Sequence, residues 1–299
     1  MGQDNILRAI AMRLAAAALF VTMNVAIKLV EARGASLGEI LFWRQAGAVL
    51  LVAAIVGAGP GFGSLRTQRF GAHVLRCVIG LGAMSLTFTT LLLLPLAEAT
   101  TIGFSMPIFA TVLGALLLHE ATGWRRWAAV LTGFVGVLIV TQPGDGHIPL
   151  AGIATGLGAA FLTAFVSILL RTIGRTEPGL TTVFWFSALS LVPLGGYYAI
   201  VMKPHPPMVW ALLLTIGGLG GLAQIAMTRS LQLGDVSVVV PMDYTALLWA
   251  TAFGWLAFGM LPAASTWIGA PLIIASGLAI VWREHVRRRA ETDRAIAQS

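Results

Sequence analysis

The sequence is built from long apolar runs that carry almost no charged residues and are separated by short polar or proline-containing stretches. Most of these runs are close to the roughly 20 residues that a helix needs to cross the hydrocarbon core of a bilayer. A transmembrane barrel would instead show shorter segments of alternating hydrophobicity. The pattern therefore predicts an all-α polytopic membrane protein with ten transmembrane helices, over residues 10–30, 38–58, 71–93, 98–118, 125–141, 150–171, 180–201, 208–230, 236–258 and 266–283.

The composition excludes a soluble domain and most kinds of enzyme. Apolar residues make up 58% of the 299 residues and charged residues only 10%, whereas soluble domains carry about 25% charged residues. The single cysteine, Cys77, rules out a disulfide framework and a four-cysteine metal site, and the five histidines lack metal-ligand spacing. The sequence offers neither a nucleophile–base constellation nor a Gly-rich phosphate loop. We therefore expect no enzyme activity, no metal or other cofactor, and no ATP-driven transport by this chain alone.

Lysine and arginine residues are unevenly distributed between the predicted loops. If the N-terminus lies inside, most of the 19 Lys and Arg residues fall on the cytoplasmic side, including Arg287, Arg288 and Arg289 near the C-terminus. Cytoplasmic loops collect Lys and Arg in this way, so we expect a multi-pass protein of the bacterial inner membrane with both termini in the cytoplasm. The net charge of +7 then belongs to helix ends at the surface of the lipid bilayer, and we expect no nucleic-acid partner.

The two halves of the sequence resemble each other. Trp43 and Trp185 each follow a phenylalanine, and Trp127 and Trp267 begin two similar apolar segments at nearly the same offset. A repeat of five helices crosses the membrane an odd number of times, so the second copy must enter from the opposite face. We therefore predict two inverted five-helix repeats with a site between them, a plan that many secondary transporters use for alternating access. The predicted division is a first repeat over 1–145, a second repeat over 146–285 and a basic cytoplasmic tail over 286–299.

Several motifs resemble those of a known family of transporters. The matching pieces are EILFWR (39–44), LPLAEATTIGFSMPIFATVLGALLLHE (94–120), GDVSVVVPMDY (234–244) and GLAIVWRE (277–284). They resemble the EamA-type branch of the drug/metabolite transporter superfamily, and within it the exporters of aromatic and other neutral amino acids. The resemblance implies ten helices in two five-helix repeats around a central substrate cavity. Gly259-Met260 departs from the Gly-Glu that the family pattern carries at this place, so a symmetric pair of acids is not expected there.

Three uncharged polar residues lie well inside the predicted helices, where polar groups are costly in lipid. Asn24 is midway along the first helix and can bind either a neighbouring helix or a substrate. Thr87 lies in the third helix, where its hydroxyl can also return to the backbone of its own helix. Gln224 occupies the matching position of the second repeat, so Thr87 and Gln224 are expected to face each other across the cavity. We predict all three as substrate-binding residues.

Asp243 is the sharpest candidate among the charged residues. It lies about 10 Å into the ninth predicted helix at ~1.5 Å per residue, too deep for a short carboxylate to reach water easily. Pro241 removes a backbone hydrogen bond just before it, and Tyr244 follows it. Asp243 can bind a substrate ammonium, carry a coupling proton or pair with a buried arginine. We predict Asp243 and Tyr244 as substrate-binding residues.

Arg44 and two tryptophans complete the predicted substrate-binding residues. Arg44 is comparably deep in the second helix, and it can bind a substrate carboxylate or pair with Glu39 or Glu98. Trp43 and Trp185, which the repeat relates, can be anchors in the membrane interface or aromatic walls of the cavity.

Together these features predict a secondary transporter that exports small, mostly neutral or aromatic amino acids across the inner membrane by alternating access. The substrate gradient or a coupling proton would supply the energy. Two alternatives stay open. The first is export of another small metabolite or a drug. The second is a structural membrane subunit that transports nothing, which would leave a deep Asp243 and an inverted repeat without a purpose.

Overall fold

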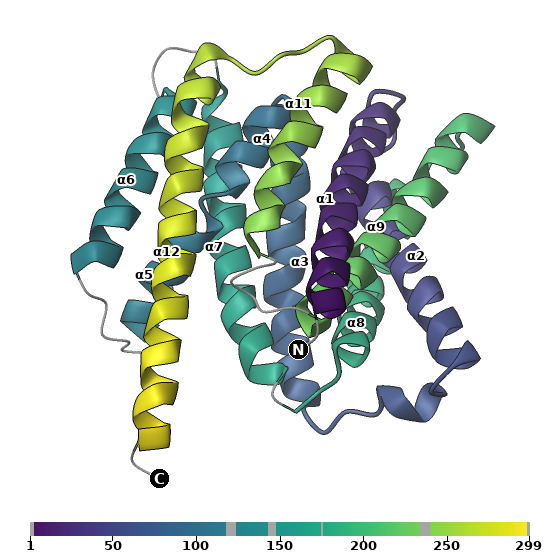
Figure 1. The fold of residues 1–299 in the computed structure, drawn as a ribbon. Coiled ribbons are helices and arrows are strands. Elements are labelled where there is room, and N and C mark those ends of the chain that lie inside the picture. Colours follow the sequence, from purple (N-terminus) through teal and green to yellow (C-terminus); the bar gives the residue numbers. More distant parts are fainter. Residues whose placement is uncertain (1–2, 118–123, 143–147, 175, 234–239, 298–299) are drawn as a thin grey trace.

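The computed structural model describes residues 3–117, 124–142, 148–174, 176–233 and 240–297, and these residues form helices, turns and loops but no strand. The helices stand together as a bundle (Figure 1). The α-helices are α1 (Gln3–Glu31), α2 (Leu37–Ala58), α3 (Phe70–Leu93), α4 (Leu96–Gly103), α5 (Met106–Leu117), α6 (Trp124–Thr141), α7 (Leu150–Ile173), α8 (Gly179–Val201), α9 (Pro207–Leu233), α11 (Thr245–Phe258) and α12 (Ala264–Ala297). Two short 3-10 helices are η1 (Phe62–Leu65) and η2 (Val240–Tyr244).

Eight stretches of the described chain are helical, long and apolar enough to cross a membrane. They comprise α1, α2, α3, the α4–α5 pair, α7, α8, α9 and the first part of α12. The two remaining predicted segments correspond to α6 and to α11, which are shorter apolar helices. Within the described residues, each of the ten predicted segments therefore coincides with one helix or with two short helices in succession, and the expected all-α membrane fold is confirmed. Residue 118 and residues 236–239 of the predicted segments lie outside the described residues.

One predicted helix is interrupted. We expected a continuous helix over 98–118, but α4 ends at Gly103 and α5 begins at Met106. Pro107 explains the break, because it has no N–H group to donate to the carbonyl of Gly103 four residues earlier. In the second repeat, η2 precedes α11 at the positions that match this break. Each repeat thus carries an irregular turn in its fourth membrane segment.

Helix packing follows a twofold symmetry between the two halves. The α1 helix packs against α9 and, correspondingly, α7 packs against α3. The α2 helix packs against α8, its counterpart in the second repeat, and α6 packs against its counterpart α12. Both ends of the chain lie at the same end of the bundle (Figure 1), as ten spans require. Since each half has five spans, the two repeats are inverted, as predicted. The predicted boundary at residue 145 lies outside the described residues, and α12 continues through the predicted tail as far as Ala297.

Two helices of different repeats touch backbone to backbone. At the crossing of α2 and α9, a Cβ atom added to Gly217 would lie 2.7 Å from the carbonyl oxygen of Trp43 and 3.0 Å from the Cα of Gly47. The next residue, Gly218, faces away, and a Cβ there would meet nothing within 4 Å. In lipid, small residues let helices approach closely and gain van der Waals contact. Glycine at 217 is therefore required for this close crossing.

Lys28 joins the end of α1 to the end of α3. Its Nζ donates to the carbonyl oxygens of Leu91 (2.6 Å) and Leu94 (2.7 Å). The last turn of a helix leaves carbonyl groups without helical donors, and a cation there also interacts favourably with the helix dipole. This contact holds the end of α1 to the end of α3, next to the part of each helix that lines a cavity.

Candidate functional site

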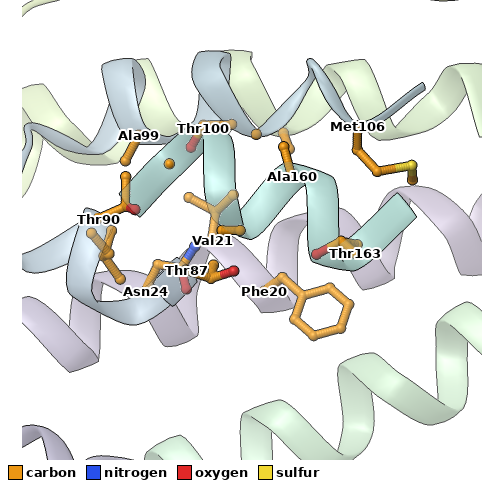
Figure 2. A pocket seen from close by; sticks show the side chains of 15 residues that line it. Phe20, Val21, Asn24, Thr87, Thr90, Ala99, Thr100, Met106, Ala160 and Thr163 are labelled. Carbon is orange, nitrogen blue, oxygen red and sulfur yellow. The ribbon is translucent and has the colours of Figure 1, made fainter. Parts of the chain in front are cut away.

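A cavity of about 290 Å³ lies among α1, α3, α4, α5, α7 and α11. Figure 2 shows side chains from several of these helices converging on it. The lining residues are Phe20, Val21, Asn24, Thr87, Thr90, Leu91, Ala99, Thr100, Gly103, Met106, Gly156, Ala159, Ala160, Thr163 and Ala246. The helices α1 to α5 belong to the first repeat, and α7 and α11 belong to the second. The cavity therefore lies between the two repeats.

Small residues and the break between α4 and α5 create this space. On α7, the lining face carries Gly156, Ala159 and Ala160, none of which has a bulky side chain. A Cβ at Gly156 would lie 2.7 Å from Cγ2 of Ile102, so glycine there allows α4 and α7 to pack closely beside the cavity. A Cβ at Gly103 would meet no atom within 4 Å. Gly103 ends α4 at the edge of open space.

The threonines of the cavity present oxygen lone pairs. The hydroxyls of Thr87 and Thr100 donate their hydrogens to the carbonyl oxygen four residues earlier in their own helices, at 2.8 Å and 2.7 Å. The hydroxyl of Thr90 lies 2.8 Å from the carbonyl oxygen of Leu86 and 3.0 Å from the hydroxyl of Thr155. A hydroxyl whose hydrogen is used in this way can still accept hydrogen bonds. The cavity therefore suits a ligand that brings hydroxyl or N–H donors of its own.

Asn24 adds donors as well as an acceptor to this surface. Its half-buried carboxamide lines the cavity and makes no side-chain hydrogen bond to the part of the chain that the structure describes. An amide can donate two hydrogen bonds and accept others. None of the lining residues given above is ionisable, and the described residues contain no group of three or more His, Cys, Asp or Glu side chains that could hold a metal ion. The cavity is thus neutral, largely apolar and rich in hydrogen-bonding groups on one part of its wall.

Only Asn24 and Thr87 of the predicted site residues line this cavity (Figure 2). Gln224 is half-buried on α9 and is not a lining residue. The structure therefore does not bring Gln224 opposite Thr87 across this cavity, because α9 packs behind α1.

The two repeat-related tryptophans lie away from the cavity. Trp43 packs edge to face against Trp210, with 5.8 Å between ring centroids, where α2 meets α9. Trp185 donates its Nε1 to the carbonyl oxygen of Leu65 (2.8 Å) and packs edge to face against Phe70 at 5.4 Å. Trp185 thereby fixes η1 at one end of the bundle. Neither tryptophan forms a wall of this cavity.

Asp243 forms an ion pair with Arg13 of α1. Arg13 donates from Nε to Oδ1 of Asp243 (2.5 Å) and from Nη2 to Oδ2, so the contact is bidentate. The Arg13 side chain is 7% exposed and the Asp243 side chain 42% exposed. Tyr244 packs against Phe104 at 4.9 Å between ring centroids, and its hydroxyl lies so close to Gly277 that a Cβ there would overlap it. Asp243 and Tyr244 therefore join helices beside the cavity and are not among its lining residues.

Arg44 is buried in α2, where its Nη1 donates to Oε1 of Gln45. It pairs with neither acid that the sequence offered as a partner. Glu39 lies 2.8 Å from Nε2 of His205 and caps the start of its own helix, and Glu98 accepts a hydrogen bond from a backbone N–H group at 2.9 Å. Arg44 does not line the cavity.

Several lining residues were not predicted from the sequence. Thr100, Gly103, Met106 and Thr163 are small or apolar residues of common helical types, so nothing in their identity distinguishes them. Pro107 was the available signal, because a proline inside a predicted membrane helix marks a break, and broken helices of transporters tend to lie at binding sites.

A comparison with protein families finds a model that matches each half of the chain once. The model is described as the EamA-like transporter family, and the matches cover residues 7–142 and 150–282.

Two curated proteins and one solved structure illustrate what the chain is similar to. It is 32% identical over 231 residues to the riboflavin transporter of Vibrio cholerae serotype O1, covering 76% of this chain and 77% of that protein. It is 25% identical over 232 residues to the S-adenosylmethionine uptake transporter of Rickettsia felis, covering 75% of this chain and 76% of that protein. A solved crystal structure with 20% identity matches with a TM-score of 0.63 over 94% of this chain and 98% of the other, which shows a shared fold.

Proposed function

The chain belongs to the EamA-like transporter family, and from this premise we propose that it carries a neutral, partly aromatic metabolite with several hydroxyl groups, of the riboflavin type. The transporter is a multi-pass membrane protein, and its substrate is a small molecule. The observation that supports this substrate class is the neutral cavity between the repeats. The oxygens of Thr87 and Thr100 can still accept hydrogen bonds, and the Asn24 amide has no hydrogen-bond partner among the described residues.

The cavity favours a neutral substrate over the zwitterionic amino acids expected from the sequence. An ammonium or carboxylate group moved from water into an apolar site costs several kcal/mol or more unless it meets an opposite charge, and no ionisable side chain lines this cavity. A ribityl-like chain, in contrast, brings several O–H donors to Thr87, Thr90 and Thr100. Phe20 and Met106 offer an aromatic face and a polarisable sulfur to a flat ring system. An aromatic amino acid stays the rival substrate for the test below.

We further propose that transport uses alternating access. The cavity lies between inverted repeats, and the breaks at Gly103 and at η2 occupy matching positions in the two halves. A rocking motion of one repeat against the other would expose such a site to each side in turn. The substrate gradient would drive net flux in either direction, since the lining residues include no group that titrates and could carry a coupling proton. The Lys and Arg distribution supports an inner-membrane location with both termini cytoplasmic.

Counterflow in proteoliposomes tests the proposed substrate. Vesicles that contain the purified full-length protein are preloaded with unlabelled riboflavin, and labelled riboflavin is added outside. We expect transient accumulation of label that protein-free vesicles do not show. Excess unlabelled riboflavin should compete, whereas tryptophan, phenylalanine and S-adenosylmethionine should compete weakly. Counterflow with the aromatic amino acids but not with riboflavin would contradict the proposed substrate class and restore the amino-acid prediction.

A further inference from the structure

Two arginines are buried outside the cavity lining. Arg44 of α2 is 7% exposed and Arg76 of α3 is 5% exposed, and neither lines the cavity. Both helices pack against α8, where the neighbouring residues Phe186 and Ser187 contact Arg76 and Gln45 respectively. Buried charges in proteins are normally paired, because an isolated charge in an apolar interior is very costly.

No carboxylate on the described part of the chain compensates these charges. Glu39 and Glu98 have the partners given above, and Asp243 pairs with Arg13. Glu177 accepts from the hydroxyl of Thr67 and lies 3.8 Å from Nε2 of His73, so it pairs with neither arginine. The phenyl ring of Phe186 is the contact that Arg76 does make, with its Cζ 4.0 Å from the ring centroid. A cation–π contact is weak compared with the cost of burying a charge, so most of that cost is left unmatched.

Arg44, Gln45 and Arg76 carry buried N–H donors that have no hydrogen-bond partner, and neither ring nitrogen of His73, one turn before Arg76 on α3, has one. The donors are Arg44 Nε, Arg76 Nε, Arg76 Nη1 and Gln45 Nε2. Gln45 connects the two arginines to α8. Its Oε1 accepts from Arg44, and it lies 3.5 Å from the hydroxyl of Ser187, the neighbour of the ring that stacks on Arg76. A set of unpaired N–H donors with excess positive charge is complementary to an oxyanion.

We propose that Arg44, Gln45 and Arg76 form a binding site for one small oxyanion, a phosphate or carboxylate group, between α2, α3 and α8. The planar guanidinium groups match the geometry of both anions. The site is separate from the cavity, since neither arginine lines it, and it does not depend on which molecule the cavity carries. The oxyanion is either a free ion or a group on a larger solute, and the experiment distinguishes these two sources.

Equilibrium binding of labelled inorganic phosphate to the purified full-length protein tests this site, with acetate as the carboxylate probe. We expect saturable binding by the native protein. Arg44→Gln and Arg76→Gln should each weaken it by about tenfold or more, since a charge-assisted donor set is lost. Arg66→Gln is the matched control, because Arg66 is exposed at the end of η1, and it should bind like the native protein. Arg76→Lys keeps the positive charge but lacks the planar guanidinium group, so it should bind phosphate with intermediate affinity. This variant keeps the proposal testable if a glutamine variant does not fold.

A thermal melting curve gives an independent readout. A ligand that binds only the folded state raises its melting temperature, so phosphate should stabilise the native protein and not the two glutamine variants. If riboflavin 5′-phosphate competes for the site while inorganic phosphate binds weakly, the oxyanion is a group carried by a solute. The proposal is overturned if the native protein binds none of phosphate, acetate and riboflavin 5′-phosphate saturably. It is also overturned if both glutamine variants melt at higher temperature in every buffer, as expected when an uncompensated charge is simply removed.

Discussion

Gly103→Phe is expected to abolish transport while the protein still folds. A Cβ at Gly103 meets nothing within 4 Å and the residue lines the cavity, so a phenyl ring there would occupy the space that a substrate needs. We expect the rate of counterflow to fall by about tenfold or more, the factor that about 1.4 kcal/mol of lost binding produces. Thermal stability should change little, because a Cβ at this position meets no neighbouring atom and the substitution removes a glycine from the end of a helix.

Gly196→Phe is the matched control for this prediction. Gly196 lies on the exposed face of α8, and a Cβ there also meets nothing within 4 Å. The control variant should transport at the native rate. Equal transport by the native protein and by Gly103→Phe, at normal folding yield, would show that the substrate does not pass through this cavity.

Asp243→Asn is expected to lower the stability of the protein substantially. The substitution leaves the buried Arg13 guanidinium without its bidentate carboxylate partner. Breaking a fully buried pair costs about 3–5 kcal/mol and an exposed one ~1 kcal/mol or less. Because Asp243 is partly exposed and Arg13 is not, we expect a loss between these limits, seen as a clear drop in the melting temperature.

A double-mutant cycle separates the ion pair from other roles of Asp243. If the pair accounts for the effect, Arg13→Gln combined with Asp243→Asn should cost no more than the worse single variant. Glu31→Gln, which changes an exposed acid at the end of α1, should leave stability unchanged. Normal stability combined with lost transport per folded molecule would contradict this account. It would instead support the role in substrate or proton binding that the sequence suggested for Asp243.

The membrane fold could be predicted from the sequence because the bilayer imposes it directly. A lipid environment requires long uncharged helices, so the ten segments are visible as apolar runs. The inverted repeat followed from the odd number of helices in each half. The break after Gly103 was not predicted, because a single proline, Pro107, is its only signal within an otherwise continuous apolar run.

The candidate site was only partly predictable, for reasons that differ between residues. Asn24 was identified because an amide in mid-membrane is costly unless it binds a neighbouring helix or a substrate. The pairing of Arg13 with Asp243 joins residues 230 positions apart, and no local pattern reveals such a contact. Arg76 lies near the start of the third predicted helix, where an arginine is expected to reach water, yet its side chain is buried. Charge position along a helix does not show which way a long side chain turns.

The most direct test of the central claim, that the cavity between the repeats opens alternately to the two sides, is thiol accessibility at Thr163. The chain has one native cysteine, Cys77, so Thr163→Cys in a Cys77→Ser background places a single thiol on the cavity wall. Thr22→Cys, on an exposed face of α1, is the control and should stay unlabelled within lipid. A small membrane-impermeant thiol reagent is applied to vesicles of each orientation. We expect labelling at Thr163→Cys from both sides, slowed by riboflavin. Labelling from one side only, or from both sides without protection by any substrate, would contradict the account.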